Sequence, residues 1–306
     1  MRNTSAIAWN GFSLAWRRSR RAPGTGPHWP SPAWLAIGGV AFAAILLLMQ
    51  FFLDSVATVD PRALPSWIGR WIGSFSAFGK SGWVLWPAAI LLVAAMAASN
   101  FAQRADRLVF ASIGARLLFL ICAVALPGLA VSIVKPLIGR VRPFVNGSVD
   151  PFLFHPFAYF RELFGSMPFP EYFYGSMPSG HTANAFAAAI AFGALMPRLR
   201  LLLLAFALTM AASRLVIGVH HVTDVMAGAL IGTCGALAIR NLFATHRLVF
   251  AVGPDGHVYA MPGPSLRRLG LALLRLLRGK GRTPVRIHGL APEAERSSAA
   301  APSRRI

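Results

Sequence analysis

The sequence has few acidic residues, few charged residues of either sign and little cysteine. Asp and Glu number 10 in 306 residues, and charged residues together make up 13% of the chain. Because a soluble globular domain carries about 25% charged residues, this composition excludes an ordinary soluble domain. The 2 cysteines, Cys122 and Cys234, both fall inside apolar segments. They exclude a disulfide framework and are predicted to be small buried side chains.

Apolar residues are abundant instead, at 56% of the chain, and they form long runs. A helix that crosses a bilayer needs about 20 mostly apolar residues. The runs predict an all-α fold, a polytopic six-transmembrane-helix bundle over residues 33–245. Residues 54–82 are expected to be a loop with tryptophans at the membrane interface. The expected spans are 33–53, 83–98, 115–134, 181–196, 201–212 and 222–243.

The formal net charge of +20 is concentrated in segments that six spans would place on one side of the membrane. These segments are an N-terminal arm (1–32), the turns 100–107 and 197–200, and a tail (246–306). The positive-inside rule assigns that side, with both termini, to the cytoplasm. No nucleic-acid-binding motif accompanies the charge, so the expected partner is the anionic membrane surface and not nucleic acid.

Two segments outside the spans predict local structure. Within the outer loop 136–180, the aromatic stretch 152–174 indicates either an interfacial helix that forms a lid or a loop packed on the bundle. In the tail, the turn 253–256 between β-prone runs predicts a small hairpin. Leucines and arginines on separate faces of 266–278 predict an amphipathic helix on the inner leaflet. Residues 287–306 are expected to be disordered.

Three polar clusters lie at predicted span ends, and all three fall on the outer face. They occupy residues 135–143, 176–181 and 213–224, and the last contains Asp224, the one acid between Glu171 and Asp255. Cations on the outer face run against the positive-inside rule, which indicates anion binding. Their convergence predicts a functional site.

The residue types in these clusters suit phosphate chemistry. Ser179 can cap the helix that follows it, and Gly180 lets a ligand approach the backbone at the start of that helix. The free N–H groups and the helix dipole at this point favour an anion. Arginine forks suit bidentate contact with phosphate oxygens. If 220–224 is helical, His220 and Asp224 lie one turn apart, and the carboxylate can activate the imidazole. Neither an acidic cluster nor cysteine partners for the histidines are present, so we expect catalysis without metal or cofactor.

At this point the chain resembles a known family, the type 2 phosphatidic acid phosphatase superfamily, which is related to vanadium haloperoxidases and bacterial acid phosphatases. Every position of the family's three-part signature is filled, in order and at the family's spacing. The residues that match it are Lys135-x6-Arg142-Pro143, Pro178-Ser179-Gly180-His181 and Ser213-Arg214-x5-His220-x3-Asp224.

The resemblance implies a role for each matched residue. His220 corresponds to the nucleophile that forms a phosphohistidine, Asp224 to the carboxylate that activates it, and His181 to the general acid. The residues implied to bind phosphate are Lys135, Arg142, Ser179, Gly180 and Arg214. His221 and Arg140 lie outside the pattern. We expect His221 to be an interfacial side chain and Arg140 to contact a lipid headgroup.

Together these features predict a multi-pass phosphatase of the bacterial inner membrane whose active site faces the periplasm. The favoured substrates are lipid phosphates or diphosphates of the undecaprenyl diphosphate or phosphatidylglycerol phosphate type, with lipid A phosphate as an alternative. Two further hypotheses are a lipid phosphotransferase on the same scaffold and a non-catalytic lipid-binding or transport protein. The sequence does not separate these.

Overall fold

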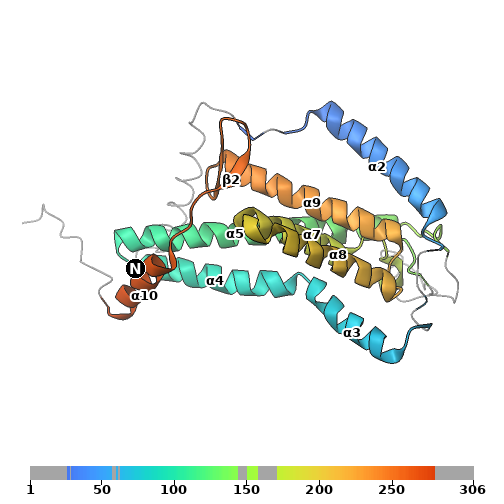
Figure 1. Cartoon of the computed structure of the whole chain (residues 1–306), viewed down its shortest axis with the longest axis horizontal. Helices are drawn as coiled ribbons and strands as arrows, with labels where there is room; N and C mark the ends of the chain where they lie inside the picture. The colour runs from blue at the N-terminus through green and yellow to red at the C-terminus, as the bar shows by residue number, and fades with distance from the viewer. Residues whose placement is uncertain are drawn as a thin grey trace, which may run out of the picture.

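The computed structural model describes residues 26–27, 29–56, 60, 63–143, 150–157 and 171–279. The chain is mostly helical, and its long helices lie alongside one another (Figure 1). The helices are α2 (Pro32–Phe52), α3 (Ser66–Ser76), α4 (Gly82–Phe101), α5 (Arg104–Ile138), α7 (Gly180–Leu195), α8 (Arg200–Val216), α9 (Val222–Thr245) and α10 (Leu266–Leu277).

All six predicted spans are helical, and 5 segments of the described chain are long and apolar enough to cross a membrane. The remaining predicted span, α7, has 16 residues and is shorter than the others. It starts after Ser179 and ends before Pro197, which begins a short 3-10 helix. The chain is therefore a multi-pass membrane protein, and five of its six expected spans reach full length.

Small residues allow α7 to pack closely in the centre of the bundle. Its buried residues are Thr182, Ala183, Ala185, Ala187, Ala189, Ala191 and Gly193. On α9, a Cβ added at Gly228 would lie 2.4 Å from the Ser179 carbonyl oxygen, and one at Gly232 would lie 2.2 Å from that of Ala183. Because these distances are too short for any side chain, both glycines are needed for the contact between α7 and α9.

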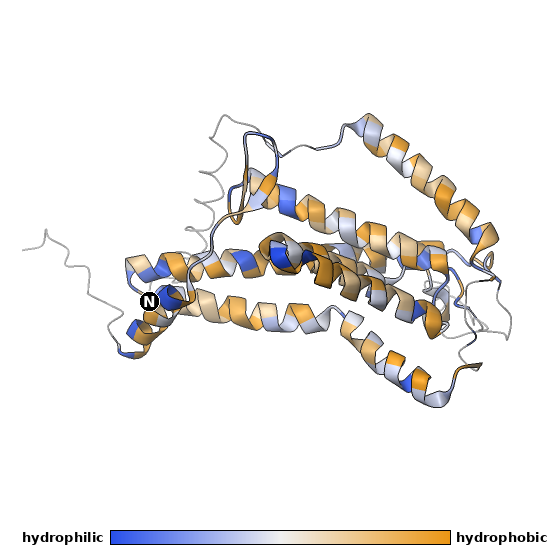
Figure 2. Ribbon diagram, in the orientation of Figure 1, coloured by the Kyte–Doolittle hydropathy of each residue, from blue (hydrophilic) through white to orange (hydrophobic). Residues whose placement is uncertain are grey.

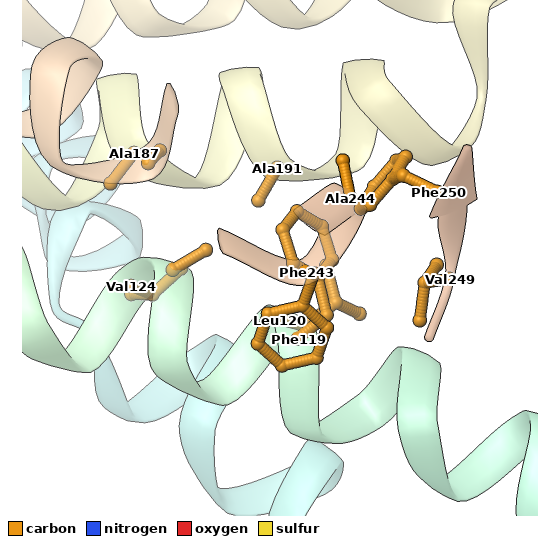
Figure 3. Close-up of a cluster of buried hydrophobic side chains, with 11 residues drawn as sticks. Phe119, Leu120, Val124, Ala187, Ala191, Phe243, Ala244, Val249 and Phe250 are labelled. Atoms are coloured by element: carbon orange, nitrogen blue, oxygen red, sulfur yellow. The ribbon is translucent and has the colours of Figure 1, made fainter. Parts of the chain in front are cut away.

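A cluster of apolar side chains joins the bundle to the tail (Figure 3). The Phe119 ring of α5 lies 5.4 Å from the Phe243 ring of α9 and 4.8 Å from the Phe250 ring, in edge-on geometries that favour aromatic pairs. Phe250 begins a hairpin in which β1 (Phe250–Val252) pairs antiparallel with β2 (Val258–Ala260). The hairpin expected from the turn residues is therefore present and packs on the core.

The tail continues into the amphipathic helix α10. Ser265 caps this helix by accepting a 3.3 Å hydrogen bond from the Arg268 N–H, and Arg275 lies 3.1 Å from Asp106 near the start of α5. Figure 1 shows the hairpin and α10 at one end of the bundle. We call the other end, where α5 ends and α7 and α9 begin, the active-site end.

The structure corrects two of the sequence predictions. Residues 66–76 of the expected loop 54–82 form helix α3, on which Trp67 and Trp71 are exposed. A short 3-10 turn (Ala77–Gly79) joins α3 to α4, so a segment read as a loop extends the helical region. Cys234 is exposed and not buried, because it lies on an outward face of α9.

Helix α2 is mostly apolar (Figure 2) and lies mostly apart from the other helices. Within this fully described helix, Gln50 is the one buried residue, and its side chain donates to the Pro151 carbonyl oxygen at 2.9 Å. The Phe51 ring packs on the Phe152 ring with a centroid separation of 4.9 Å. The C-terminal turn of α2 is thus attached to the segment that follows α5.

The described part of the outer loop packs on the bundle. Gly139 ends α5 in a left-handed conformation (φ 60°), and the Phe154 backbone then pairs with that of Arg140. The His155 ring lies edge-on to Tyr174 at 5.5 Å. Residues 150–157 thus form no helix and contact the bundle. The lid hypothesis concerns mainly 158–170, which lie outside the described residues.

Candidate active site

The three polar clusters meet at the active-site end of the bundle. Lys135, in the last turn of α5, donates to the Gly175 carbonyl oxygen at 2.6 Å. Arg142 donates to the same oxygen at 3.5 Å and to the Val219 carbonyl oxygen at 3.0 Å. These bonds connect the first cluster to the segments that carry the second and third.

The second cluster opens α7. The Ser179 N–H donates to the Asp224 carbonyl oxygen at 2.9 Å, which fixes the start of α7 against the start of α9. The Ser179 side chain caps no backbone N–H of α7, contrary to our expectation; its hydroxyl accepts instead from Thr182 at 3.0 Å. Gly180 lies beside the first cluster, since an added Cβ would be 3.9 Å from the Lys135 Cε.

His181 follows at the first turn of α7, among four cations. Arg214, Lys135, Lys80 and Arg142 all act on it electrostatically. Lys80 comes from the turn between α3 and α4 and was not among the predicted site residues. Its signal in the sequence was a cation next to an apolar span, the same feature that marked Lys135.

Arg214 lies in the last turn of α8 and is buried. Its guanidinium donates to the Ser76 hydroxyl at the end of α3. The pair joins α8 to α3 and places the positive charge of Arg214 near those of Lys135 and Arg142.

His220 and Asp224 lie together, with 3.5 Å between Nδ1 and Oδ2, but not as successive turns of a helix. Helix α9 begins at Val222, so His220 precedes it. The carboxylate folds back over the helix start and accepts the His221 N–H at 2.9 Å. The one-turn helical arrangement considered for 220–224 does not occur, because the Asp224 carboxylate, at the third helical position, caps the first turn of α9.

The His220 imidazole is held in its neutral form. It is 2% exposed, and burial lowers the pKa of His220 to about 3, despite the opposing effect of Asp224. Because Nδ1 faces the carboxylate, Nε2 is the nitrogen available to an incoming group. A neutral, oriented imidazole is the form that a nucleophile requires.

Asp224 has further partners that the sequence did not reveal. Its Oδ2 accepts from the Ser176 hydroxyl at 2.5 Å, and its Oδ1 accepts from Arg140 at 2.7 Å. Arg140 is 0% exposed and also pairs with Asp54 at 2.7 Å, so the expected contact with a lipid headgroup is wrong. Arg140 cannot reach the surface because two buried carboxylates hold its guanidinium.

His221 is also buried, at 0% exposed, and is not the interfacial side chain that we expected. Its Nδ1 lies 3.5 Å from the Asp54 carbonyl oxygen. Burial lowers the pKa of His221, so this ring too is neutral. Its backbone N–H donates to the carboxylate of the catalytic candidate Asp224, and its side chain accepts from the Asp224 N–H in a capping box.

A mainly apolar cavity of about 220 Å³ lies beside His181. Gly79 lines it and touches the histidine, since a Cβ there would be 2.9 Å from the His181 Cδ2. Other lining residues are Lys80, Trp83, Asn184, Ala188 and Phe206. A larger cavity of about 450 Å³ lies between α5 and α10, far from the polar clusters.

The arrangement combines cations, a helix start and a neutral nucleophile. Lys135, Arg142 and Arg214 can neutralise a phosphate, and the N–H groups at the start of α7 favour the same anion. Among the described residues, no group of three or more His, Cys, Asp or Glu side chains could hold a metal ion. The cations, the helix start and the neutral imidazole suit attack of a nitrogen on phosphorus, with the developing charge stabilised by side chains.

Comparison with known proteins agrees with this chemistry. Residues 116–248 match the PAP2 superfamily model. A lipid A 1-phosphatase of Rhizobium johnstonii is 29% identical over 252 residues, which cover 81% of this chain and 94% of that protein. A lipid A 1-phosphatase of Rhizobium etli is 29% identical over 231 residues, covering 74% and 92%.

Two solved structures are also similar. The crystal structure of Aquifex aeolicus LpxE is 23% identical, with a TM-score of 0.40 over 58% of this chain and 88% of that one. The first transmembrane PAP2 type phosphatidylglycerolphosphate phosphatase from Bacillus subtilis is 18% identical, with a TM-score of 0.42 over 66% and 94%.

Proposed function

We propose that this membrane lipid phosphatase, whose residues 116–248 match the PAP2 superfamily, removes the 1-phosphate of lipid A. The observation that carries the proposal is the similarity to two lipid A 1-phosphatases, which extends over nearly their whole length. It favours lipid A over undecaprenyl diphosphate and phosphatidylglycerol phosphate, the substrates that the sequence alone had favoured.

In the proposed ground state, the phosphate lies between the cations and the start of α7. Lys135, Arg142 and Arg214 bind its oxygens, and Ser179 and Gly180 contribute at the helix start. The apolar cavity beside His181 suits the hydrophobic part of the leaving group. The substrate thereby presents its phosphorus to His220 and its ester oxygen to His181.

In the first step, Nε2 of His220 attacks phosphorus. An N–P bond forms as the P–O bond to the lipid breaks, and His181 gives its proton to the departing oxygen. The negative charge of the bound phosphate favours the protonated form of His181 against the surrounding cations. Asp224 accepts the Nδ1 proton of the imidazole in a hydrogen bond and stabilises the positive charge that develops on the ring. The products are the dephosphorylated lipid and a phosphohistidine.

In the second step, water attacks the phosphohistidine. Neutral His181 takes a proton from the water, the N–P bond breaks, and inorganic phosphate leaves. His220 returns to its neutral form and His181 is again protonated. No metal ion takes part in either step of this proposal.

The proposed orientation follows the distribution of charge. The basic arm, turns and tail lie in the cytoplasm of a bacterial cell, the protein crosses the inner membrane, and the active-site end faces the periplasm. The amphipathic α10, at the other end of the bundle, would then lie on the inner leaflet.

A substrate panel tests the proposal. Purified protein in detergent micelles is given lipid A, undecaprenyl diphosphate or phosphatidylglycerol phosphate, and released phosphate is measured while mass spectrometry locates the lost group. We expect lipid A to lose its 1-phosphate with the highest kcat/KM, and His220→Ala to lower kcat at least about 1000-fold. Faster hydrolysis of either other lipid would refute the assigned substrate. Appearance of the phosphate on a second lipid would indicate a phosphotransferase.

A further inference from the structure

We infer that Asp54, which follows the C-terminal end of α2, is a positioning residue for the His220–Asp224 pair. The inference rests on the proposed function, since it assigns Asp54 to the same site. Asp54 lies outside the three polar clusters, and a sequence reading places it simply at the end of a span. In the structure it is 0% exposed and lies within the active-site end of the bundle.

Asp54 binds the start of α9 directly. Its Oδ1 accepts the Thr223 N–H at 3.0 Å, and its Oδ2 accepts the Thr223 hydroxyl at 2.5 Å. Thr223 is the second residue of α9, so its N–H is one of the groups that a helix leaves without an internal partner. Asp54 therefore caps α9 from a position 169 residues away, and its negative charge is favourable at that helix end.

Asp54 also shares one guanidinium with Asp224. Arg140 donates through Nη2 to Asp54 and to the Pro151 carbonyl oxygen, both at 2.7 Å. Through Nη1 it donates to Asp224 and to the Thr223 hydroxyl, again both at 2.7 Å. The flat guanidinium fork thus sets the distance between the two carboxylates, which a lysine ammonium could not do.

The sharing has an electrostatic consequence. Arg140 divides its one positive charge between two carboxylates, those of Asp54 and Asp224. If Arg140 faced Asp224 alone, the pair would be neutral, and Asp224 would interact less strongly with the positive charge that develops on His220. Asp54 therefore keeps Asp224 effective as the partner of the nucleophile, although it touches neither His220 nor the phosphate.

The position of Asp54 is fixed by the last turn of α2. Gln50 donates to the Pro151 carbonyl oxygen, the same atom that accepts from Arg140, and Phe51 packs on Phe152. These contacts tie the end of α2 to the segment that carries Arg140. A weakly packed helix is in this way attached by its final turn to the catalytic carboxylate.

The test is Asp54→Asn, which keeps the size of the side chain and removes its charge. We expect kcat to fall about 10- to 100-fold while KM changes less than about 3-fold, since Lys135, Arg142 and Arg214 are untouched. In an Asp224→Asn background the same change should cause little further loss, because Asp54 acts through Asp224. An unchanged kcat, or an equal loss in both backgrounds, would overturn the inference.

A binding experiment makes the test independent of the lipid substrate. Orthovanadate mimics the transferring phosphoryl group and binds the nucleophile, whereas inorganic phosphate needs only the cations. We expect Asp54→Asn to weaken vanadate binding about 10-fold or more and to leave phosphate binding within about 3-fold. Equal weakening of vanadate binding and phosphate binding would mean that Asp54 supports only the fold, and would refute a positioning role.

Controls separate the possible failures. Asp106→Asn removes another buried, ion-paired carboxylate at the opposite end of α5, and should leave kcat and both affinities unchanged. If Asp54→Asn does not fold, Thr223→Val is the second test, because it removes the hydroxyl shared by Asp54 and Arg140. It should shift the ratio of vanadate affinity to phosphate affinity in the same direction, and an unchanged ratio would overturn the inference. A wild-type protein inactive on lipid A, with the vanadate effect intact, would refute the substrate and not the role of Asp54.

Discussion

Replacing Arg140 by methionine should destabilise the protein strongly. The change removes a fully buried guanidinium that donates four hydrogen bonds, two of them to carboxylates. It leaves Asp54 and Asp224 buried, close together and without their shared counter-charge. Removing one partner of a buried ion pair costs about 3–5 kcal/mol, and here one residue serves two partners, so we expect a loss at the upper end of that range.

Thermal unfolding in detergent, followed by circular dichroism, measures this loss. A cost of about 3–5 kcal/mol corresponds to a fall in Tm on the order of 10 °C for a protein of this size. Arg140→Lys keeps the charge but not the fork, and should fall between wild type and Arg140→Met. The matched control is Arg275→Met, whose partner is Asp106 but whose side chain is 50% exposed, so its loss should stay below about 1 kcal/mol.

A double variant can refute the reasoning. If the cost arises from two uncompensated carboxylates, adding Asp54→Asn to Arg140→Met removes one of them and should recover part of the lost stability. Independent losses that simply add, or an Arg140→Met protein as stable as wild type, would show that the guanidinium does not balance these charges.

Three other predictions concern the site itself. Gly79→Val should lower kcat, because even its Cβ would lie 2.9 Å from the His181 Cδ2 and 2.8 Å from the Met210 sulfur; an unchanged kcat in the phosphate-release assay would contradict this contact. Burial lowers the pKa of His220 to about 3, whereas an unfolded histidine has a pKa of about 6.5, so only the unfolded chain gains this proton as pH falls below about 6.5. The stability that neutral His220 contributes is therefore complete above pH 6.5 and declines toward pH 3, and His220→Gln should lose less Tm between pH 7.5 and 5 than wild type does. Finally, EDTA should leave phosphate release unchanged while orthovanadate inhibits it; inhibition by EDTA that Mg²⁺ reverses would refute the metal-free mechanism.

The helices and the meeting of the three clusters could be predicted from the sequence because both depend on local patterns. Long apolar runs mark the spans whatever their neighbours are, and Lys135, His181 and Arg214 each lie at the end of such a run. The third and fifth spans end, and the fourth begins, on the same side of the membrane, so all three residues are expected on one face. The prediction needed no knowledge of which helix packs against which.

The partners of Asp224 could not be predicted in the same way. Asp54 is 86 residues from Arg140 and 169 from Thr223, and pairing over such separations leaves no periodicity in the sequence. Arg140 was interpreted as a headgroup contact because an arginine at a span end usually reaches the interface. The one-turn arrangement considered for His220 and Asp224 does not occur, because α9 begins at Val222, where the sixth span was expected to begin. The capping contacts that place the Asp224 carboxylate over the helix start leave no pattern in the sequence.

The attachment of α2 by its last turn also bears on how the enzyme matures. Asp54 directly follows the first predicted span to leave the ribosome, yet it caps α9, the last predicted span to be made. In the proposed site, the contacts of the Asp224 carboxylate are complete only when the first and last predicted spans have both inserted and their facing ends lie at the same membrane surface. A chain whose first span entered the bilayer in the opposite sense would keep all three sequence motifs and still lack Asp54 beside Arg140. If Asp54 acts as we propose, activity requires the correct topology of the first span, and phosphatase activity can therefore report on membrane insertion.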